Sequence, residues 1–94
     1  MKLYSTTIGD GPKRAALVHG MTGSGPTWFD FAPWVADLGY TVTLVDLRGH
    51  GRSERGPGYS PDDLGDDLVD TLPPELDVIA GHSLGGRALL SAVE

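Results

Sequence analysis

The chain has 94 residues, a formal net charge of −6 at pH 7, 39% hydrophobic residues and no cysteine. This length allows one small domain, and the composition is typical of a globular rather than a disordered protein. The acidic balance argues against a nucleic-acid or anionic membrane surface, and without cysteine there are no disulfides or thiolate metal sites. Neither a signal-like N-terminus nor a run of 18 apolar residues is present, which favours a cytoplasmic protein without a membrane span.

The first two predicted elements are strands. Residues 2–8 are rich in β-type side chains and stop at the turn cluster 9–12, so we expect a strand at a sheet edge. Residues 14–18 form an apolar run that would be buried on both faces, which favours an internal, parallel strand. A Gly-rich loop over residues 19–26 follows this second strand.

Residues 28–38 carry apolar side chains at helical spacing. We predict one helix there, with Asp30 as its N-cap, because this would place Pro33 in the first turn, where its missing N–H costs little. Gly39 is expected to end the helix. The two tryptophans of this segment are interpreted as core residues rather than as a ligand platform.

The next strand is predicted over residues 41–45, and the helix after it begins at a capping signal. Ser60 is the expected N-cap, with Pro61 at the first helical position and Asp63 at the third. Leucines at helical spacing line one side of this helix. Its aspartates are interpreted as a solvated face and not as a metal site: Asp62, Asp63, Asp66, Asp67 and Asp70.

The last part of the chain has the pattern of a nucleophile elbow. A short apolar run over 76–80, expected to be a buried strand, leads directly into Gly-His-Ser-Leu-Gly over 81–85, and a helical segment follows over 87–93. The five-residue pattern is weakly specific in a chain with 14 glycines, but the strand before it and the helix after it strengthen it. Ser83 would stand at the apex, with Gly81 and Gly85 preventing a collision between strand and helix.

Strands that alternate with helices of this length predict a single α/β domain over residues 1–94, built on a mostly parallel sheet. Three loops, at 19–23, 46–53 and 81–86, then resemble in order and separation the N-terminal half of the α/β-hydrolase fold superfamily of esterases, lipases and lactonases. The resemblance covers the chain from about Leu3 onward. It implies an incomplete α/β-hydrolase fold with a doubly wound sheet, in which the strand before His19 lies between the other two parallel strands.

The resemblance also implies roles for individual residues. Ser83 matches the catalytic nucleophile of a serine esterase or lipase, which attacks an ester, thioester or related acyl bond. The backbone N–H groups of Met21 and Leu84 match the two donors of the oxyanion hole. The implied substrate is a small acyl molecule, and no cofactor or metal is implied. A serine at this position disfavours the epoxide-hydrolase and dehalogenase branches, which use aspartate.

The three histidines are interpreted as structural rather than as the general base. His19 and His50 fall in loops that shape and brace the site in the family, and the His82 side chain should point away from that of Ser83. Asp46 is interpreted as structural for the same reason. None of the histidines has the i, i+4 spacing of a helical zinc site.

The acid and base that would activate Ser83 are missing downstream. In this fold they follow the serine, but only Glu94 follows it as an acid and no histidine follows it at all. The helix over 87–93 is apolar nearly all round, and the elbow strand would be left as an open edge. We therefore expect the N-terminal portion of a longer hydrolase, inactive by itself and able to self-associate through that edge.

The sequence also allows non-catalytic alternatives. The chain can instead be a non-catalytic remnant, or the partner subunit of a second polypeptide that carries the acid and the histidine. A phosphate-binding module is disfavoured, because the Gly-rich loop over 20–25 matches neither G-x-x-x-x-G-K-[ST] nor G-x-G-x-x-G and has no lysine near it.

Overall fold

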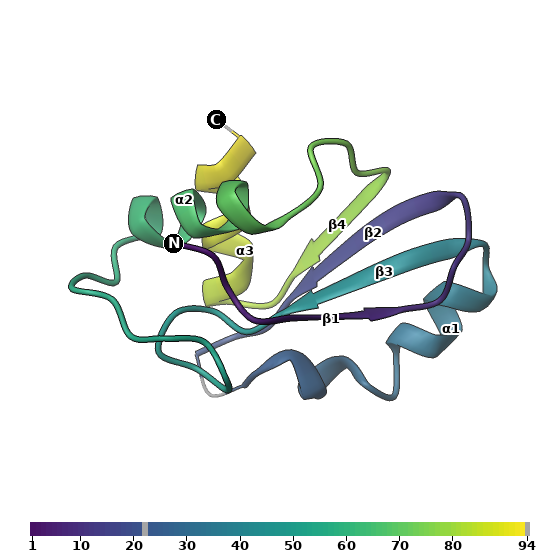
Figure 1. The fold of residues 1–94 in the computed structure, drawn as a ribbon, viewed down its shortest axis with the longest axis horizontal. Coiled ribbons are helices and arrows are strands. Elements are labelled where there is room, and N and C mark those ends of the chain that lie inside the picture. Colours follow the sequence, from purple (N-terminus) through teal and green to yellow (C-terminus); the bar gives the residue numbers. More distant parts are fainter. Residues whose placement is uncertain (22, 94) are drawn as a thin grey trace.

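A computed structural model describes residues 1–21 and 23–93 (Figure 1). Its elements alternate as the sequence predicts: β1 Ser5–Ile8, β2 Lys13–Val18, the 3₁₀ helix η1 Gly25–Trp28, α1 Ala32–Asp37, β3 Tyr40–Val45, α2 Pro61–Thr71, β4 Val78–Gly81 and α3 Leu84–Val93. The four strands form one sheet in the order β1-β3-β2-β4. β1 is an antiparallel edge strand, and β2 pairs in parallel with both β3 and β4. The predicted α/β class and the central position of β2 are confirmed.

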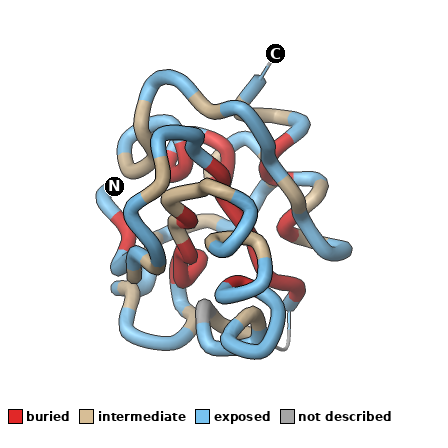
Figure 2. The backbone as a smooth tube through the Cα atoms, turned by 90° about the vertical axis from the view of Figure 1, so that its right-hand side faces the viewer, coloured by how far each residue is buried: buried red, intermediate tan, exposed pale blue. Residues whose placement is uncertain are grey.

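The sheet has one apolar core on each face, which follows from the alternation of side chains along a strand. Leu17 of β2 packs with Val42 and Leu44 of β3 on the face that α1 covers. Val18 and Val45 point to the opposite face and pack against α2 and α3. Figure 1 shows the helices on both sides of the sheet, as in a doubly wound fold. In Figure 2 the loops are mostly exposed, and short buried segments alternate with exposed ones along the chain. None of the described helices is long and apolar enough to cross a membrane.

The single helix predicted over 28–38 is wrong in its extent. The segment divides into η1 and α1, and each of them has a proline in its first turn, Pro26 and Pro33 respectively. A proline fits the start of a helix but not its interior, so two prolines start two short helices. The N-cap of α1 is Phe31 rather than Asp30. Trp28 packs against the core as expected, whereas Trp34 is 63% exposed, so the core interpretation of this second tryptophan is wrong.

α2 begins as its sequence predicts. The Ser60 hydroxyl accepts from the Asp63 N–H at 3.1 Å, and the Asp63 carboxylate accepts from the Ser60 N–H at 3.2 Å, which is a complete capping box. Leu64 and Leu68 are fully buried on the inner side of the helix. The solvated face predicted for the aspartates is wrong at one position, because Asp67 is also fully buried.

β4 lies at the edge of the described sheet, and it is not the buried strand that its apolar sequence predicts. It pairs with β2 on one side, and no strand of the described residues pairs with its other side. Val78 and Ile79 are consequently 41% and 40% exposed. The open edge expected from the sequence is therefore present, and next to it the apolar residues Leu90 and Val93 of α3 are exposed as well.

Candidate active site

Three loops meet at the carboxyl edge of the parallel strands. In the sheet register Val18 of β2 is paired with Val45 of β3 and with Gly81 of β4, so the three strands end at the same level. The segments that follow them begin with His19, Asp46 and His82. Loops at this end of a parallel sheet, where the chain reverses its winding, are where doubly wound folds bind ligands.

Ser83 occupies the sharp turn between β4 and α3. Its side chain is exposed, and its φ of 54° is the only positive φ of a non-glycine residue in the described chain. The left-handed conformation costs an L-residue about 1–2 kcal/mol, and such strain is a common feature of functional sites. Two backbone hydrogen bonds hold the turn: the Gly85 N–H donates to the His82 carbonyl at 3.0 Å, and the Arg87 N–H donates to the Ser83 carbonyl at 3.1 Å.

Close backbone approaches explain the two glycines of the elbow. A Cβ on Gly81 would lie 2.6 Å from the Gly86 nitrogen, so Gly81 does prevent the collision of strand and helix that the sequence predicts. A Cβ on Gly85 would instead lie 2.3 Å from the Val18 carbonyl oxygen. Gly85 therefore allows the start of α3 to pack against the end of β2 rather than against its own strand.

The two expected oxyanion donors lie on segments that approach each other closely. Leu84 is the first residue of α3, where an N–H group has no acceptor within the helix. Met21 follows Gly20, and a Cβ on Gly20 would lie 2.8 Å from Nδ1 of His82. Gly20 before Met21 and His82 before Ser83 thus lie so close together that a side chain at position 20 would collide with His82. The tertiary structure brings together two segments that are 62 positions apart in the sequence.

His19 and His50 hold the backbone on either side of Met21. The His19 ring is fully buried; its Nδ1 lies 2.6 Å from the Gly20 carbonyl oxygen, and its Nε2 accepts from the Leu47 N–H at 2.9 Å. These partners assign a neutral ring with its proton on Nδ1. Burial lowers the pKa of His19 below its ordinary value, which agrees with this assignment.

His50 contacts two carbonyl oxygens. Its Nδ1 lies 2.9 Å from the Arg48 carbonyl oxygen, and its Nε2 lies 2.6 Å from that of Met21. The two histidine rings lie 5.1 Å apart between centroids. Asp46 accepts the Arg52 N–H at 2.9 Å, so its carboxylate holds the turn of its own loop. These contacts agree with the structural roles expected for His19, His50 and Asp46.

No hydrogen bond among the described residues joins the Ser83 hydroxyl to a histidine or an aspartate. A serine hydroxyl needs a neighbouring base to become an effective nucleophile. Glu94, the one acid that follows Ser83 in the sequence, lies outside the described residues. The described arrangement therefore holds a candidate nucleophile and candidate oxyanion donors, and it leaves the base to be supplied by other residues.

A cavity of about 440 Å³ opens beside Ser83 on the side of the free sheet edge. Its lining is mostly apolar and comes from β4, the elbow and α3, including Ile79, Arg87 and Leu90. Met21 is not among the lining residues. A second cavity of about 490 Å³ shares Ile79, Leu89 and Val93 with the first and continues toward Pro73 and Pro74. The apolar surface thus runs from the end of α2 along β4 to the candidate nucleophile.

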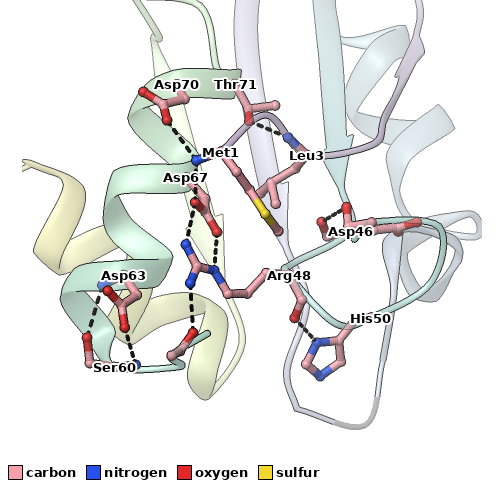
Figure 3. A network of polar contacts seen from close by, with 12 residues as sticks. Met1, Leu3, Asp46, Arg48, His50, Ser60, Asp63, Asp67, Asp70 and Thr71 are labelled. Atoms are coloured by element: carbon pink, nitrogen blue, oxygen red, sulfur yellow. Dashed lines mark hydrogen bonds and ion pairs between the residues drawn. The ribbon is translucent and has the colours of Figure 1, made fainter. Parts of the chain in front are cut away.

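An ion pair that was not predicted from the sequence supports the loop after β3. The Arg48 guanidinium donates two hydrogen bonds to Asp67, from Nε at 2.6 Å and from Nη2 at 2.8 Å (Figure 3). The ammonium of Met1 adds a contact of 2.7 Å to the same carboxylate. The sequence did contain a signal for the burial of Asp67, because Asp67 lies three residues after Leu64 and next to Leu68, on the inner face of α2.

Opposing influences act on the ionisation of Asp67. Burial is the largest and would raise the pKa of the carboxyl group, but the hydrogen bonds and charges of Arg48 and the Met1 ammonium together lower the pKa below its ordinary value. The same contacts raise the pKa of Arg48 and of the Met1 ammonium. The pair is therefore ionised at neutral pH, and it ties the loop that carries His50 to α2.

Comparisons with known proteins agree with this geometry. The family model of the alpha/beta hydrolase fold matches residues 16–94. The chain is 34% identical over 92 residues to the pimeloyl-[acyl-carrier protein] methyl ester esterase of Methylococcus capsulatus, covering 98% of this chain and 35% of that protein. It is 36% identical over 80 residues to the esterase YbfF of Escherichia coli, covering 80% of this chain and 30% of that protein.

A solved structure of an esterase from a marine microorganism superimposes with a TM-score of 0.89 at 30% identity. The superposition covers 98% of this chain and 36% of that one. The chain therefore spans about a third of the length of the relatives it matches.

Proposed function

Because the chain belongs to the α/β-hydrolase fold family, we propose that it carries the nucleophile and the oxyanion donors of an esterase that forms an acyl-enzyme at Ser83. The strained, exposed turn at Ser83 supports the proposal, since a left-handed serine between a strand and a helix is the geometry of a nucleophile elbow, and Gly20 before Met21 approaches His82 before Ser83. The esterase names of the relatives support a carboxylic ester as the substrate.

The proposed reaction has two halves. Ser83 Oγ forms a bond to the acyl carbon while its proton passes to a base, and the carbonyl oxygen becomes an oxyanion that receives hydrogen bonds from the N–H groups of Met21 and Leu84. Collapse of this intermediate expels the alcohol, which takes up the proton, and leaves the acyl group on Ser83. Water then repeats the sequence and releases the carboxylic acid. Each oxyanion donor contributes about 10²–10³ in rate.

The base and its orienting acid are proposed to come from outside residues 1–94. No histidine follows Ser83, and both ring nitrogens of His19 and of His50 are occupied by backbone groups. The relatives contain about two thirds of their length beyond the matched part, which is ample room for both residues. We accordingly expect no ester hydrolysis by the 94-residue chain alone.

A chimera tests this function. Residues 1–94 replace the matching part of the Methylococcus capsulatus esterase, and hydrolysis of p-nitrophenyl acetate and butyrate is measured after circular dichroism has established that the chimera is folded. We expect turnover and labelling by a fluorophosphonate, both of which Ser83→Ala reduces by about 10⁴ or more. Ser91→Ala is the matched control, since Ser91 lies on α3 and bonds to Asp62 of α2, away from the elbow.

Two results would count against the proposal. A folded chimera that neither turns over ester nor reacts with the fluorophosphonate supports the non-catalytic alternative. Equal activity of the Ser83→Ala and Ser91→Ala chimeras would show that another residue is the nucleophile. A second chimera with the marine esterase, which superimposes with a TM-score of 0.89, shows whether a negative result comes from a poorly matched partner.

A further inference from the structure

Contacts on both sides of Met21 hold the backbone that carries its N–H group. The Gly20 carbonyl and the Met21 N–H belong to the same peptide unit, and the described chain has no cis peptide bond, so the two groups point in opposite directions. The Gly20 carbonyl faces Nδ1 of His19 and also accepts from the Gly23 N–H at 3.1 Å. The Met21 N–H is consequently directed away from the buried His19 ring.

The second peptide unit is held by a different residue. The Met21 carbonyl lies 2.6 Å from Nε2 of His50, which comes from the loop after β3. A change in either backbone dihedral of Met21 rotates one of the two units relative to the other. The direction of the Met21 N–H follows the Gly20 carbonyl, and the His50 contact adds a second hold on Met21 from the following peptide unit.

His50 is itself anchored to the rest of the fold. Its Nδ1 contacts the Arg48 carbonyl, and the Arg48 side chain makes the two-fold hydrogen bond to Asp67 on α2 (Figure 3). A continuous series of contacts therefore leads from α2 through Asp67, Arg48 and His50 to Met21. A ring with its proton on Nε2 donates to Met21, and a ring with both protons donates to Met21 and Arg48 together.

We propose that His50 is a positioning residue for the oxyanion hole: by donating from Nε2 to the Met21 carbonyl it holds Met21 on the side opposite to the Gly20 contacts and so limits the movement of the Met21 N–H. The effect of His50 on the rate of ester hydrolysis rests on the proposed function. The contact itself is a property of the 94-residue chain. His50 is also the more accessible of the two histidines, because it is half-buried whereas His19 is fully buried.

Three substitutions separate the two contacts of His50. The amide nitrogen of glutamine reaches the place of Nε2, so His50→Gln retains the donor to Met21. The amide nitrogen of asparagine reaches the place of Nδ1, so His50→Asn retains only the donor to Arg48. His50→Phe has a ring of similar shape without either donor. The Asn and Gln variants form a matched pair in size and polarity.

Nuclear magnetic resonance on the full 94-residue chain provides the first test. We expect the amide resonance of Met21 to shift, its heteronuclear NOE to fall and its hydrogen exchange to accelerate in His50→Asn and His50→Phe, while His50→Gln stays close to the wild type. Unchanged amide shifts in β2 establish that each variant is folded. The proposal is overturned if Met21 stays as ordered in His50→Asn as in His50→Gln, and this pair decides the matter even if His50→Phe unfolds.

Kinetics of the chimera provide the second test. Displacing one oxyanion donor without removing it should lower kcat about tenfold in His50→Asn, a part of the 10²–10³ that a donor contributes, with KM within about twofold. His50→Gln should recover most of the loss. If His50→Asn and His50→Gln have equal kcat values in an active chimera, His50 does not affect catalysis through its contact with Met21. An inactive parent chimera would contradict the proposed function, and the resonance comparison would still decide the role of His50.

Discussion

At the scale of single residues, the left-handed backbone of Ser83 is required by the proposed function and lowers the stability of the fold. The left-handed conformation is one that glycine adopts without strain, yet the position carries a serine. Neighbouring residues maintain the conformation: the flanking glycines allow the close approach, and the hydrogen bonds from Gly85 and Arg87 close the turn. Strain of this kind is retained where a side chain has to be presented at a fixed point.

Replacement of Ser83 by glycine should therefore stabilise the chain. Relief of the left-handed strain gains about 1–2 kcal/mol, and the greater freedom of glycine in the unfolded state offsets about 0.5–1 kcal/mol of it. We expect Ser83→Gly to have a free energy of unfolding about 0.5–1 kcal/mol above that of Ser83→Ala, which retains a Cβ and the strain. Urea denaturation followed by circular dichroism measures the difference, and equal midpoints would contradict a strained turn.

At the scale of elements, the ion pair of Arg48 and Asp67 joins the loop after β3 to the middle of α2. Removing one partner of a buried pair leaves the other without its counter-charge and costs about 3–5 kcal/mol. Asp70 also contacts the Met1 ammonium, at 2.9 Å, but its side chain is 55% exposed and solvent screens it. The two aspartates thus differ in burial while they share a helix and a partner.

Asp67→Asn should destabilise the chain by about 3–5 kcal/mol, and Asp70→Asn by less than about 1 kcal/mol. The pH dependence follows from the lowered pKa of Asp67 in the folded state. Its contribution is fully present above the unfolded pKa of about 3.9 and is lost as the pH falls through the lower folded value. Urea midpoints at pH 6, 4 and 3 should fall more steeply for the wild type than for Asp67→Asn. Parallel pH profiles would show that Asp67 does not carry this linkage.

At the scale of the whole molecule, the open edge of β4 and the apolar surface beside it are the main departure from a closed fold. Unpaired strand edges offer backbone donors and acceptors to another strand, and exposed apolar patches add to the attraction. The opposite edge strand, β1, is different, because its exposed positions are the polar residues Ser5 and Thr7. We expect the isolated chain to self-associate through β4 and to bind the dye ANS there.

Ile79→Lys should weaken this association, because Ile79 lies on the open strand and lines both apolar cavities. A lysine there places a charge where a second apolar surface would dock. In Ile79→Lys the sedimentation coefficient should depend less on protein concentration and approach that of a monomer. The fluorescence of bound ANS should fall. Thr7→Lys on β1 is the control and should leave both measurements unchanged. Association that persists in Ile79→Lys but not in Thr7→Lys would locate the interface at the other edge.

The sequence by itself determined what depends on neighbours along the chain. The order of strands and helices, the capping box at Ser60 and the Gly-x-Ser-x-Gly turn are set by residues within a few positions of each other, so the local pattern was sufficient. Over 28–38 the local pattern was misleading, because a continuous apolar spacing spans two short helices that each begin at a proline.

Only the tertiary structure decided which residues share an environment across long separations. The burial of Asp67 depends on the arrival of Arg48 from another loop, and the exposure of β4 depends on the absence of a strand beside it within the described sheet. The contact between His50 and Met21 joins two loops that parallel pairing places at one edge. Side-chain pattern predicts which residues prefer to be buried, whereas the packing of distant elements determines which of them are.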